Sequence, residues 1–405
     1  MHQSNFIVRE PLLDPQQNVL GYELTWQQHN GAVVTETDLE ALVSFVAEQV
    51  NDDEHGWLLR HKTLFLEAVP AMLSTDALFA LPPEHTVLSI LTSELADSGT
   101  MAAVQALRAG GVGVLLREAD LSRLGKSLPS IASYIEVSFS GVEDVPAQAR
   151  TYAKLKHSSV RMVGRPVATW ADFDACAALG LDAFVGKLHL TPRPDAGNDN
   201  KGMNAAQSII LQLMQLVSQN ADVAQLETLL KRDTSLSYKL LRFINSAGFG
   251  AGREVTSIKQ ALTLLGYAPL NRWLTLLLLT ATTSAHSPVL METAVVRGRL
   301  AELLGQSAMS KSDAENIFVA GMFSLLDRLL GVSMEEVLNT IPLSEDVVAA
   351  LLTRGGKYGP YLALAEACEL NSDLVALLAS SLNLSPYDVN KAHLQALAWA
   401  QNIGA

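Results

Sequence analysis

The segment KRDTSLSYKLLRFINSAGFG, residues 231–250, has the pattern of one short amphipathic helix followed by a turn. Its leucines and isoleucine recur three or four residues apart, which is the spacing of one helix face. Asp233 and the hydroxyl residues after it are typical helix caps, and Gly248 and Gly250 favour a stop. We predict a helix that begins near Asp233 and ends before Gly248.

The following segment, VTSIKQALTLLGYAPLNRW, residues 255–273, repeats this organisation. A hydroxyl residue opens an apolar helix face, Gly266 ends it, and Trp273 belongs to the next buried face. From residue 204 to residue 402, almost every stretch has helical spacing between glycine or proline turns. The second half of the chain is therefore expected to be all-α.

Residues 191–202 are rich in Pro, Gly and Asn and have no periodic apolar face, which predicts a linker. Before this linker, short apolar runs alternate with helical patterns. The runs expected to form strands are Phe6–Arg9, Val19–Thr25, Leu64–Val69, Thr86–Leu91, Val112–Leu116, Tyr134–Val137, Val160–Val163 and Ala183–Val185. Alternation of strands and helices predicts a mostly parallel sheet, and about eight strands predict a closed α/β barrel of the TIM type, complete or incomplete.

Composition limits the classes of function. A chain of 405 residues is expected to form two or three domains, and 49% apolar with 18% charged residues predicts packed cores. The net charge of −13 repels phosphate backbones, so nucleic acid is not an expected partner. Cys176 and Cys368 are expected in the core, and no apolar run is long enough to span a membrane. These features predict a cytoplasmic protein.

The helical half resembles the HDOD domain. The positions that carry this resemblance include Asp233, Lys239, Asn245, Ser246, Gly266 and Trp273. HDOD domains are similar in fold to the HD-type metal phosphohydrolases but lack their ligands. The resemblance implies a helical signalling and interaction module over residues 203–405.

An HD-type phosphohydrolase needs a His-Asp dipeptide and further His and Asp ligands. No His-Asp dipeptide occurs in the sequence. In the segment that resembles the metal-binding helix, residues 321–327, Ser324 and Leu325 stand where His and Asp would stand. No metal site is therefore expected in this half.

The N-terminal half resembles an EAL domain. Residues 9–14 and 21–24 are similar to the opening of that domain, and Glu23 stands at the Glu of its Glu-Ala-Leu signature. An EAL domain followed by an HDOD domain is the arrangement of a family of bacterial cyclic di-GMP signalling proteins. The resemblance implies an EAL-like domain over residues 1–190.

Active EAL phosphodiesterases bind two divalent cations through carboxylates and an Asn. By the resemblance, Arg117 replaces a cation-binding carboxylate, Glu136 replaces the catalytic Lys, and Arg165 replaces a Glu. The EAL-like domain is therefore expected to be degenerate, with no catalytic residue, no metal and no cofactor. Glu23 is expected to be a vestigial residue of the Glu-Ala-Leu signature.

Arg117 and Arg165 have two interpretations. They can form internal ion pairs with nearby carboxylates, for which Glu118, Asp120 and Glu136 are candidates. They can also bind a phosphate or nucleotide without a metal, because guanidinium groups match phosphate oxygens. The sequence leaves both open.

The expected function is that of a non-catalytic scaffold in cyclic di-GMP signalling that acts through protein–protein contacts. The resemblance implies a diguanylate cyclase, a phosphodiesterase or a kinase as the partner. Assembly into a homo-oligomer is a further alternative. Two alternatives remain. One is an enzyme, either a residual phosphodiesterase or an HD-type phosphohydrolase, and the other is a metal-free nucleotide sensor.

Overall fold

The computed structural model describes residues 5–27, 35–52, 56–119, 128–141, 144–153, 159–191, 205–244, 255–282, 288–330, 333–340 and 343–401. The chain divides into two compact units. The barrel unit comprises Met1–Arg193, Ser287–Val289 and Leu364–Ala405, and the helical unit comprises Pro194–His286 and Leu290–Ala363. Most of the expected linker, residues 192–202, lies outside the described residues.

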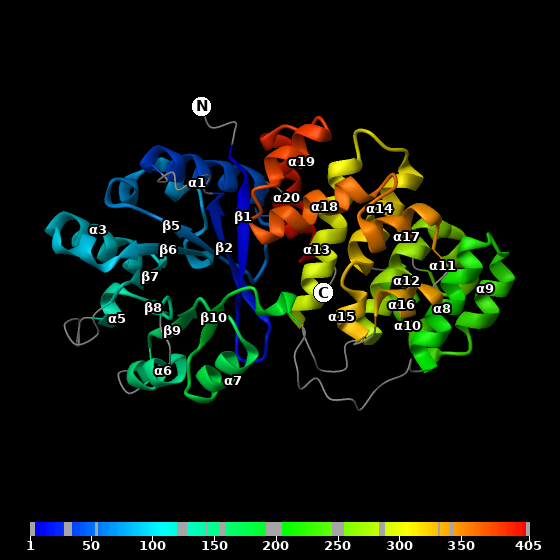
Figure 1. Ribbon diagram of the computed structural model, residues 1–405, viewed down its shortest axis with the longest axis horizontal. Coiled ribbons are helices and arrows are strands. Elements are labelled where there is room, and N and C mark those ends of the chain that lie inside the picture. Colours follow the sequence, from blue (N-terminus) through cyan, green and yellow to red (C-terminus); the bar gives the residue numbers. More distant parts are fainter. Residues whose placement is uncertain are drawn as a thin grey trace. The chain divides into compact units, whose positions relative to one another are not determined.

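The barrel unit contains a closed barrel in the order β1-β10-β9-β8-β7-β6-β5-β2 (Figure 1). Its strands are β1 (Ile7–Leu13), β2 (Val19–Trp26), β5 (Thr63–Glu67), β6 (Thr86–Leu91), β7 (Gly113–Arg117), β8 (Tyr134–Ser138), β9 (Arg161–Arg165) and β10 (Ala183–Val185). β1 runs antiparallel to both neighbours, and the other adjacent pairs are parallel. The eight expected strands and the closed, mostly parallel barrel are therefore confirmed. β3 (Asn51–Asp52) and β4 (Gly56–Trp57) form a separate small sheet.

Helices cover the outside of the barrel and apolar side chains fill its inside. The covering α-helices include α1 (Glu36–Val50), α2 (Asp76–Phe79), α3 (Ser98–Ala109), α5 (Leu128–Ile131), α6 (Val145–Ala153) and α7 (Trp170–Ala178). Phe173 of α7 and Val104 of α3 are buried against the outer face. Phe65, Leu115 and Val163 belong to the apolar cluster that the inner faces of the strands share.

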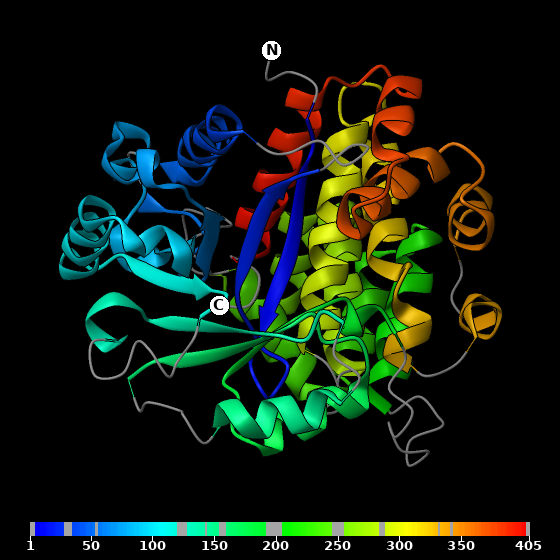
Figure 2. The same cartoon turned by 60° about the vertical axis from the view of Figure 1, so that its left-hand side comes forward.

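The end of the chain packs on β1. The last three helices are α18 (Gly359–Leu370), α19 (Val375–Ser381) and α20 (Pro386–Ala400). Residues from Leu364 onward belong to the barrel unit. In both views α20 lies beside β1 (Figures 1 and 2). The side chain of Asn390 on α20 accepts a hydrogen bond from the Ile7 amide at 2.8 Å and donates one to the Asn5 carbonyl at 2.9 Å.

A buried polar cluster joins these helices to β1. Arg9 lies 3.8 Å from Glu369 of α18 and 3.3 Å from the His393 ring of α20, and all three side chains are buried. Burial lowers the pKa of His393 to about 3, with the Arg9 charge as a second cause. β1 and β2 form a hairpin without a crossover helix, so these C-terminal helices cover β1 instead. The compact units therefore divide the chain differently from the expected boundaries, which placed all of residues 203–405 in one domain.

The helical unit contains α8 (Ala205–Ser218), α9 (Val223–Leu230), α10 (Thr234–Ile244), α11 (Ile258–Leu265), α12 (Tyr267–Thr282), α13 (Pro288–Gly305), α14 (Lys311–Phe323), α15 (Leu326–Leu330), α16 (Met334–Thr340), α17 (Glu345–Thr353) and the start of α18. α13 and α14 approach closely at two glycines, because a Cβ on Gly321 would lie 2.6 Å from the Gly298 Cα. Within the described ranges every regular element of this unit is a helix, which confirms the expected class.

None of the helices in the described part of the chain combines the length and apolarity needed to cross a bilayer. The cytoplasmic location stays a prediction.

Replacing Asn390 by Ala is expected to destabilise the barrel unit by about 1–3 kcal/mol, because the buried Ile7 amide loses its acceptor. Gln395→Ala is the matched control, since Gln395 lies on the same helix and is exposed. Urea unfolding followed by circular dichroism measures both. Equal midpoints for the two variants would contradict this role of α20.

Candidate functional site

The strands carry a polar layer at one mouth of the barrel. Side chains on one face of a strand recur every two residues. Phe65 and Leu115 belong to the apolar interior. Glu67 follows Phe65 by two residues on β5, and Arg117 follows Leu115 by two residues on β7. The same step leads from Val163 to Arg165 on β9. The carboxyl ends of these parallel strands therefore place charged side chains above the apolar interior.

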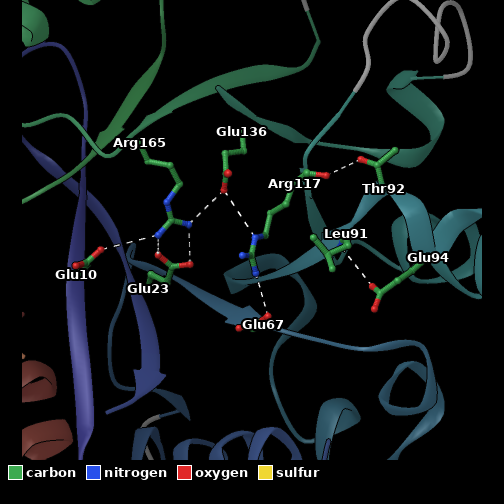
Figure 3. A network of polar contacts seen from close by, with 9 residues as sticks. All are labelled: Glu10, Glu23, Glu67, Leu91, Thr92, Glu94, Arg117, Glu136 and Arg165. Atoms are coloured by element: carbon green, nitrogen blue, oxygen red, sulfur yellow. Dashed lines mark hydrogen bonds and ion pairs between the residues drawn. The ribbon is translucent and has the colours of Figure 1, made fainter. Parts of the chain in front are cut away.

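Arg165 lies among three carboxylates of this layer (Figure 3). Its two terminal nitrogens pair with the two carboxylate oxygens of Glu23, one of them at 2.9 Å. Glu136 lies 3.6 Å away and Glu10 lies 3.9 Å away. The Arg165 side chain is 20% exposed, and that of Glu23 is 11% exposed. One guanidinium group thus contacts carboxylates from β1, β2 and β8.

Arg117 forms the second arm of the network. Its guanidinium donates to Glu67 at 2.9 Å and lies 3.9 Å from Glu136, so Glu136 links the two arginines. Thr92 holds the end of β7 in place by donating to the Arg117 carbonyl at 2.7 Å. Among these six charged side chains, four carboxylates face two guanidinium groups. The mouth therefore carries an excess of negative charge.

Burial and charge shift the pKa values in the same network. Burial raises the pKa of Glu136, although Arg165 and Arg117 oppose the shift. Burial and the neighbouring Glu23 raise the pKa of Glu10. Burial would lower the pKa of Arg165, but Glu23, Glu136 and Glu10 outweigh it and raise the pKa. Arg165 therefore keeps its positive charge at every physiological pH.

The ion pairs weighed in the sequence analysis are present, but with a partly different set of partners. Glu136 was a named candidate, whereas Glu10, Glu23 and Glu67 were not. Their signal was in the sequence, since each faces the barrel interior in the two-residue alternation of its strand. Asp120 lies outside the described residues. Anion binding by the arginines stays a prediction.

The positions of the HDOD resemblance have structural roles where they are described. Asp233 caps α10, because its carboxylate accepts from the amides of Ser235 at 2.8 Å and Leu236 at 3.0 Å. Gly266 has a φ of 72° between α11 and α12, and Trp273 is buried. Lys239 is exposed on α10. Asn245 and Ser246 lie outside the described residues.

Ser324 and Leu325, at the end of α14, are both buried. The Ser324 hydroxyl donates to the Gly321 carbonyl at 2.7 Å and accepts from Arg297 of α13 at 2.8 Å. Arg297 is 5% exposed. The position that resembles the His-Asp dipeptide is thus packed within the helical core and contacts a guanidinium group.

Comparison with known proteins gives both a domain and full-length relatives. The model of the HDOD domain matches residues 203–340. The uncharacterized protein YuxH of Bacillus subtilis is 24% identical over an alignment of 409 positions, which covers 98% of each chain. The cyclic di-GMP phosphodiesterase CdgJ of Vibrio cholerae is 25% identical over 406 residues, 99% of this chain and 93% of that protein.

Solved structures are similar to part of the chain. BlrP1 of Klebsiella pneumoniae, in a complex with manganese and cyclic di-GMP, is 17% identical with a TM-score of 0.37. The match covers 46% of this chain and 56% of that one, so this chain spans about half of the longer protein. An EAL domain protein from Listeria monocytogenes is 18% identical with a TM-score of 0.35, covering 45% of this chain and 86% of that one.

The resemblance to EAL-HDOD signalling proteins is confirmed. The family model identifies an HDOD domain, the N-terminal part is an eight-stranded barrel, and the two relatives match the chain from end to end.

Replacing Arg165 by Met is expected to destabilise the barrel unit by roughly 3 kcal/mol, because Glu23 and Glu136 are then left with uncompensated charge. Adding Glu23→Gln to Arg165→Met removes one unpaired charge and should recover part of the loss. Chemical unfolding of the wild type, both single variants and the double variant measures this coupling.

The control is Arg161→Met on the same strand, because Arg161 is exposed and its guanidinium lies against the Tyr134 side chain, away from the carboxylates of the mouth. It should change stability by less than about 0.5 kcal/mol. Equal losses for Arg161→Met and Arg165→Met would show that the network contributes nothing specific.

Proposed function

Because the chain joins a barrel to an HDOD domain and matches a cyclic di-GMP phosphodiesterase over nearly its whole length, we propose that it is a non-catalytic signalling protein of the cyclic di-GMP network. It acts by contact with other signalling proteins. The observation that carries this proposal is the position of Arg165 among the carboxylates of the barrel mouth.

The residues at the mouth do not fit the two divalent cations of an active EAL domain. A magnesium ion binds oxygen ligands at about 2.0–2.1 Å in near-octahedral geometry. Both carboxylate oxygens of Glu23 already contact the Arg165 guanidinium, so a cation would have to displace it. In the described ranges, no three His, Cys, Asp or Glu side chains are grouped closely enough to hold a metal. These observations support loss of the phosphodiesterase reaction.

The helical unit supports the same conclusion. Metal-dependent chemistry at the end of α14 needs imidazole and carboxylate ligands that solvent can reach. Ser324 and Leu325 are instead buried, and the hydroxyl of Ser324 is bonded to Arg297. A positive charge beside this position disfavours a bound cation.

The two rival functions have weaker support. The Vibrio relative is named as a phosphodiesterase, which favours a residual phosphodiesterase, and Glu23 is retained in the barrel. A nucleotide sensor needs the two arginines to receive phosphate, but both already pair with carboxylates that are in excess at the mouth. The excess negative charge repels a phosphate group.

Hydrolysis of cyclic di-GMP by the purified full chain tests the proposal. The expected result is no turnover with Mg²⁺ or Mn²⁺ above the rate of Glu23→Gln, and no stoichiometric divalent metal in the purified protein. Glu23→Gln is isosteric and removes the retained carboxylate. Metal-dependent turnover in the wild type that this variant abolishes would establish the enzyme instead.

A stripe on α10 is the contact surface that the proposal favours. Ser235, Tyr238, Lys239 and Arg242 are spaced three and four residues apart and are all exposed, so they lie on one helix face. Tyr238 is 65% exposed. Tyrosine and arginine are the residue types that contribute most to binding at protein interfaces. The two basic side chains also contrast with the net charge of −13.

Partner capture from the native host tests this surface. The double variant Tyr238→Ala, Arg242→Glu is expected to reduce the yield of co-purified partner about tenfold or more without lowering the melting temperature. Lys311→Glu, which changes an exposed cation on α14, is the control and should leave capture unchanged. Undiminished capture by the double variant would exclude the α10 stripe.

A further inference from the structure

A buried histidine on α20 lies against the arginine that connects this helix to β1. The Nε2 atom of His393 lies 3.3 Å from the Arg9 guanidinium, and the two residues are 1% and 5% exposed. A guanidinium group keeps its charge and has donors only, so Nε2 must accept a hydrogen bond from Arg9. The contact therefore requires a neutral His393 ring that carries its proton on Nδ1.

Protonation of this ring would reverse the contact. Both nitrogens of a charged imidazole are donors, so Nε2 would then face Arg9 donor to donor, and two positive charges would meet away from water. Glu369 opposes this repulsion, but it lies 3.8 Å from Arg9 and already pairs with that charge. Within the described ranges, Nδ1 has no acceptor in hydrogen-bonding geometry. The closed cluster therefore excludes a proton from His393.

The charges that act on the His393 ring are those of Arg9 and Glu369. A backbone contact with Ile7 favours the charged ring, as Glu369 does, but burial and Arg9 outweigh both. Cys368 precedes Glu369 on α18 and is buried as well. Burial raises the pKa of this thiol to about 12, so it stays neutral and adds no charge to the cluster.

The other elements around α20 carry their ionisable groups elsewhere. α1 and α19 also pack on α20, and α19 contains no ionisable side chain. On α20 itself, Asp388 is exposed and Lys391 precedes His393 by two residues, so neither shares the face of His393. The carboxylates of α1 are exposed or half-buried; they are Glu36, Asp38, Glu40 and Glu48.

We propose that Arg9, Glu369 and His393 form a latch that holds the C-terminal helices on β1 only while the His393 ring is neutral. When the latch opens, water reaches His393 and the ring can take up the proton that the closed latch excludes. Acid therefore loosens α20 and the end of α18 from β1. This conformational device lies outside the barrel mouth and does not depend on the proposed signalling function.

The sign and size of the effect follow from the two states of the latch. In the closed latch, burial and the Arg9 charge lower the pKa of His393 from its ordinary value of 6.5 to about 3. A pKa that is lower in the closed state means that stability is lost as the pH falls below 6.5. Between pH 7.5 and pH 5.5, the ratio of open to closed latch is expected to rise about tenfold.

The two cysteines of the chain offer a local and a distant reporter of this opening. Cys368 is 1% exposed beside the latch, and Cys176 is 0% exposed on α7, on another side of the barrel. Labelling with 4,4′-dithiodipyridine follows Cys368 in the full-length variant Cys176→Ala and follows Cys176 in the variant Cys368→Ala. Each rate is divided by the rate of the urea-unfolded chain at the same pH, which removes the pH dependence of the thiol itself.

Corrected labelling of Cys368 is expected to rise about tenfold from pH 7.5 to pH 5.5, whereas that of Cys176 should change by less than about twofold. His393→Gln keeps an acceptor for Arg9 but cannot take up a proton. In this variant the rise of Cys368 labelling should disappear. An equal rise with and without His393→Gln overturns the inference, as does a Cys368 rate that does not change with pH.

The protonation state of the ring gives a second test, which needs no variant at position 393. The sequence contains nine histidines. In nitrogen-15 spectra of the histidine-labelled full chain, one ring is expected to stay neutral at pH 5, with its proton on Nδ1. If all nine rings are charged at pH 5, or if the neutral ring carries its proton on Nε2, the latch does not exist.

Discussion

The contact of one guanidinium group with carboxylates from three strands organises the mouth of this barrel. Arg165 on β9 reaches Glu10 on β1, Glu23 on β2 and Glu136 on β8. Without this charge, the antiparallel register of β1 and β2 would leave two carboxylates opposed and a third with little access to water. The polar layer at the mouth therefore depends on Arg165.

β1 carries charge on both of its faces. Glu10 faces the network at the mouth, and its neighbour Arg9 faces outward into the buried cluster with Glu369 and His393. Adjacent residues of a strand point in opposite directions, so one strand connects the polar layer with the helices at the end of the chain. In the helical unit a second buried arginine, Arg297, bonds to Ser324 at the position where the resemblance places a metal ligand. In both units, a guanidinium group thus lies at or beside a position where the resemblance would place a metal ligand.

The sequence predicted the parts of this structure that depend on local pattern. The eight strands, the all-α second half and the cap at Asp233 follow from two-residue and helical periodicity and from capping chemistry. Glu136 was a candidate partner of the arginines because it lies on a neighbouring strand. Glu10 and Glu23 were missed as partners because they approach Arg165 only when the barrel closes and β1 pairs with β10. Glu67 was missed although only β6 separates β5 from β7, which carries Arg117. The packing of α20 on β1 was missed for a similar reason, since the contact between Ile7 and Asn390 joins residues 383 positions apart.

The central claim is that an arginine and not a metal holds the carboxylates of the barrel mouth. Crystals of the full chain grown with Mn²⁺ and cyclic di-GMP, with diffraction data collected at the manganese absorption edge, test it most directly. We predict no anomalous peak within coordination distance of Glu23 and an Arg165 guanidinium bonded to that carboxylate. A pair of manganese peaks bound to Glu23, with Arg165 turned away, would contradict the account.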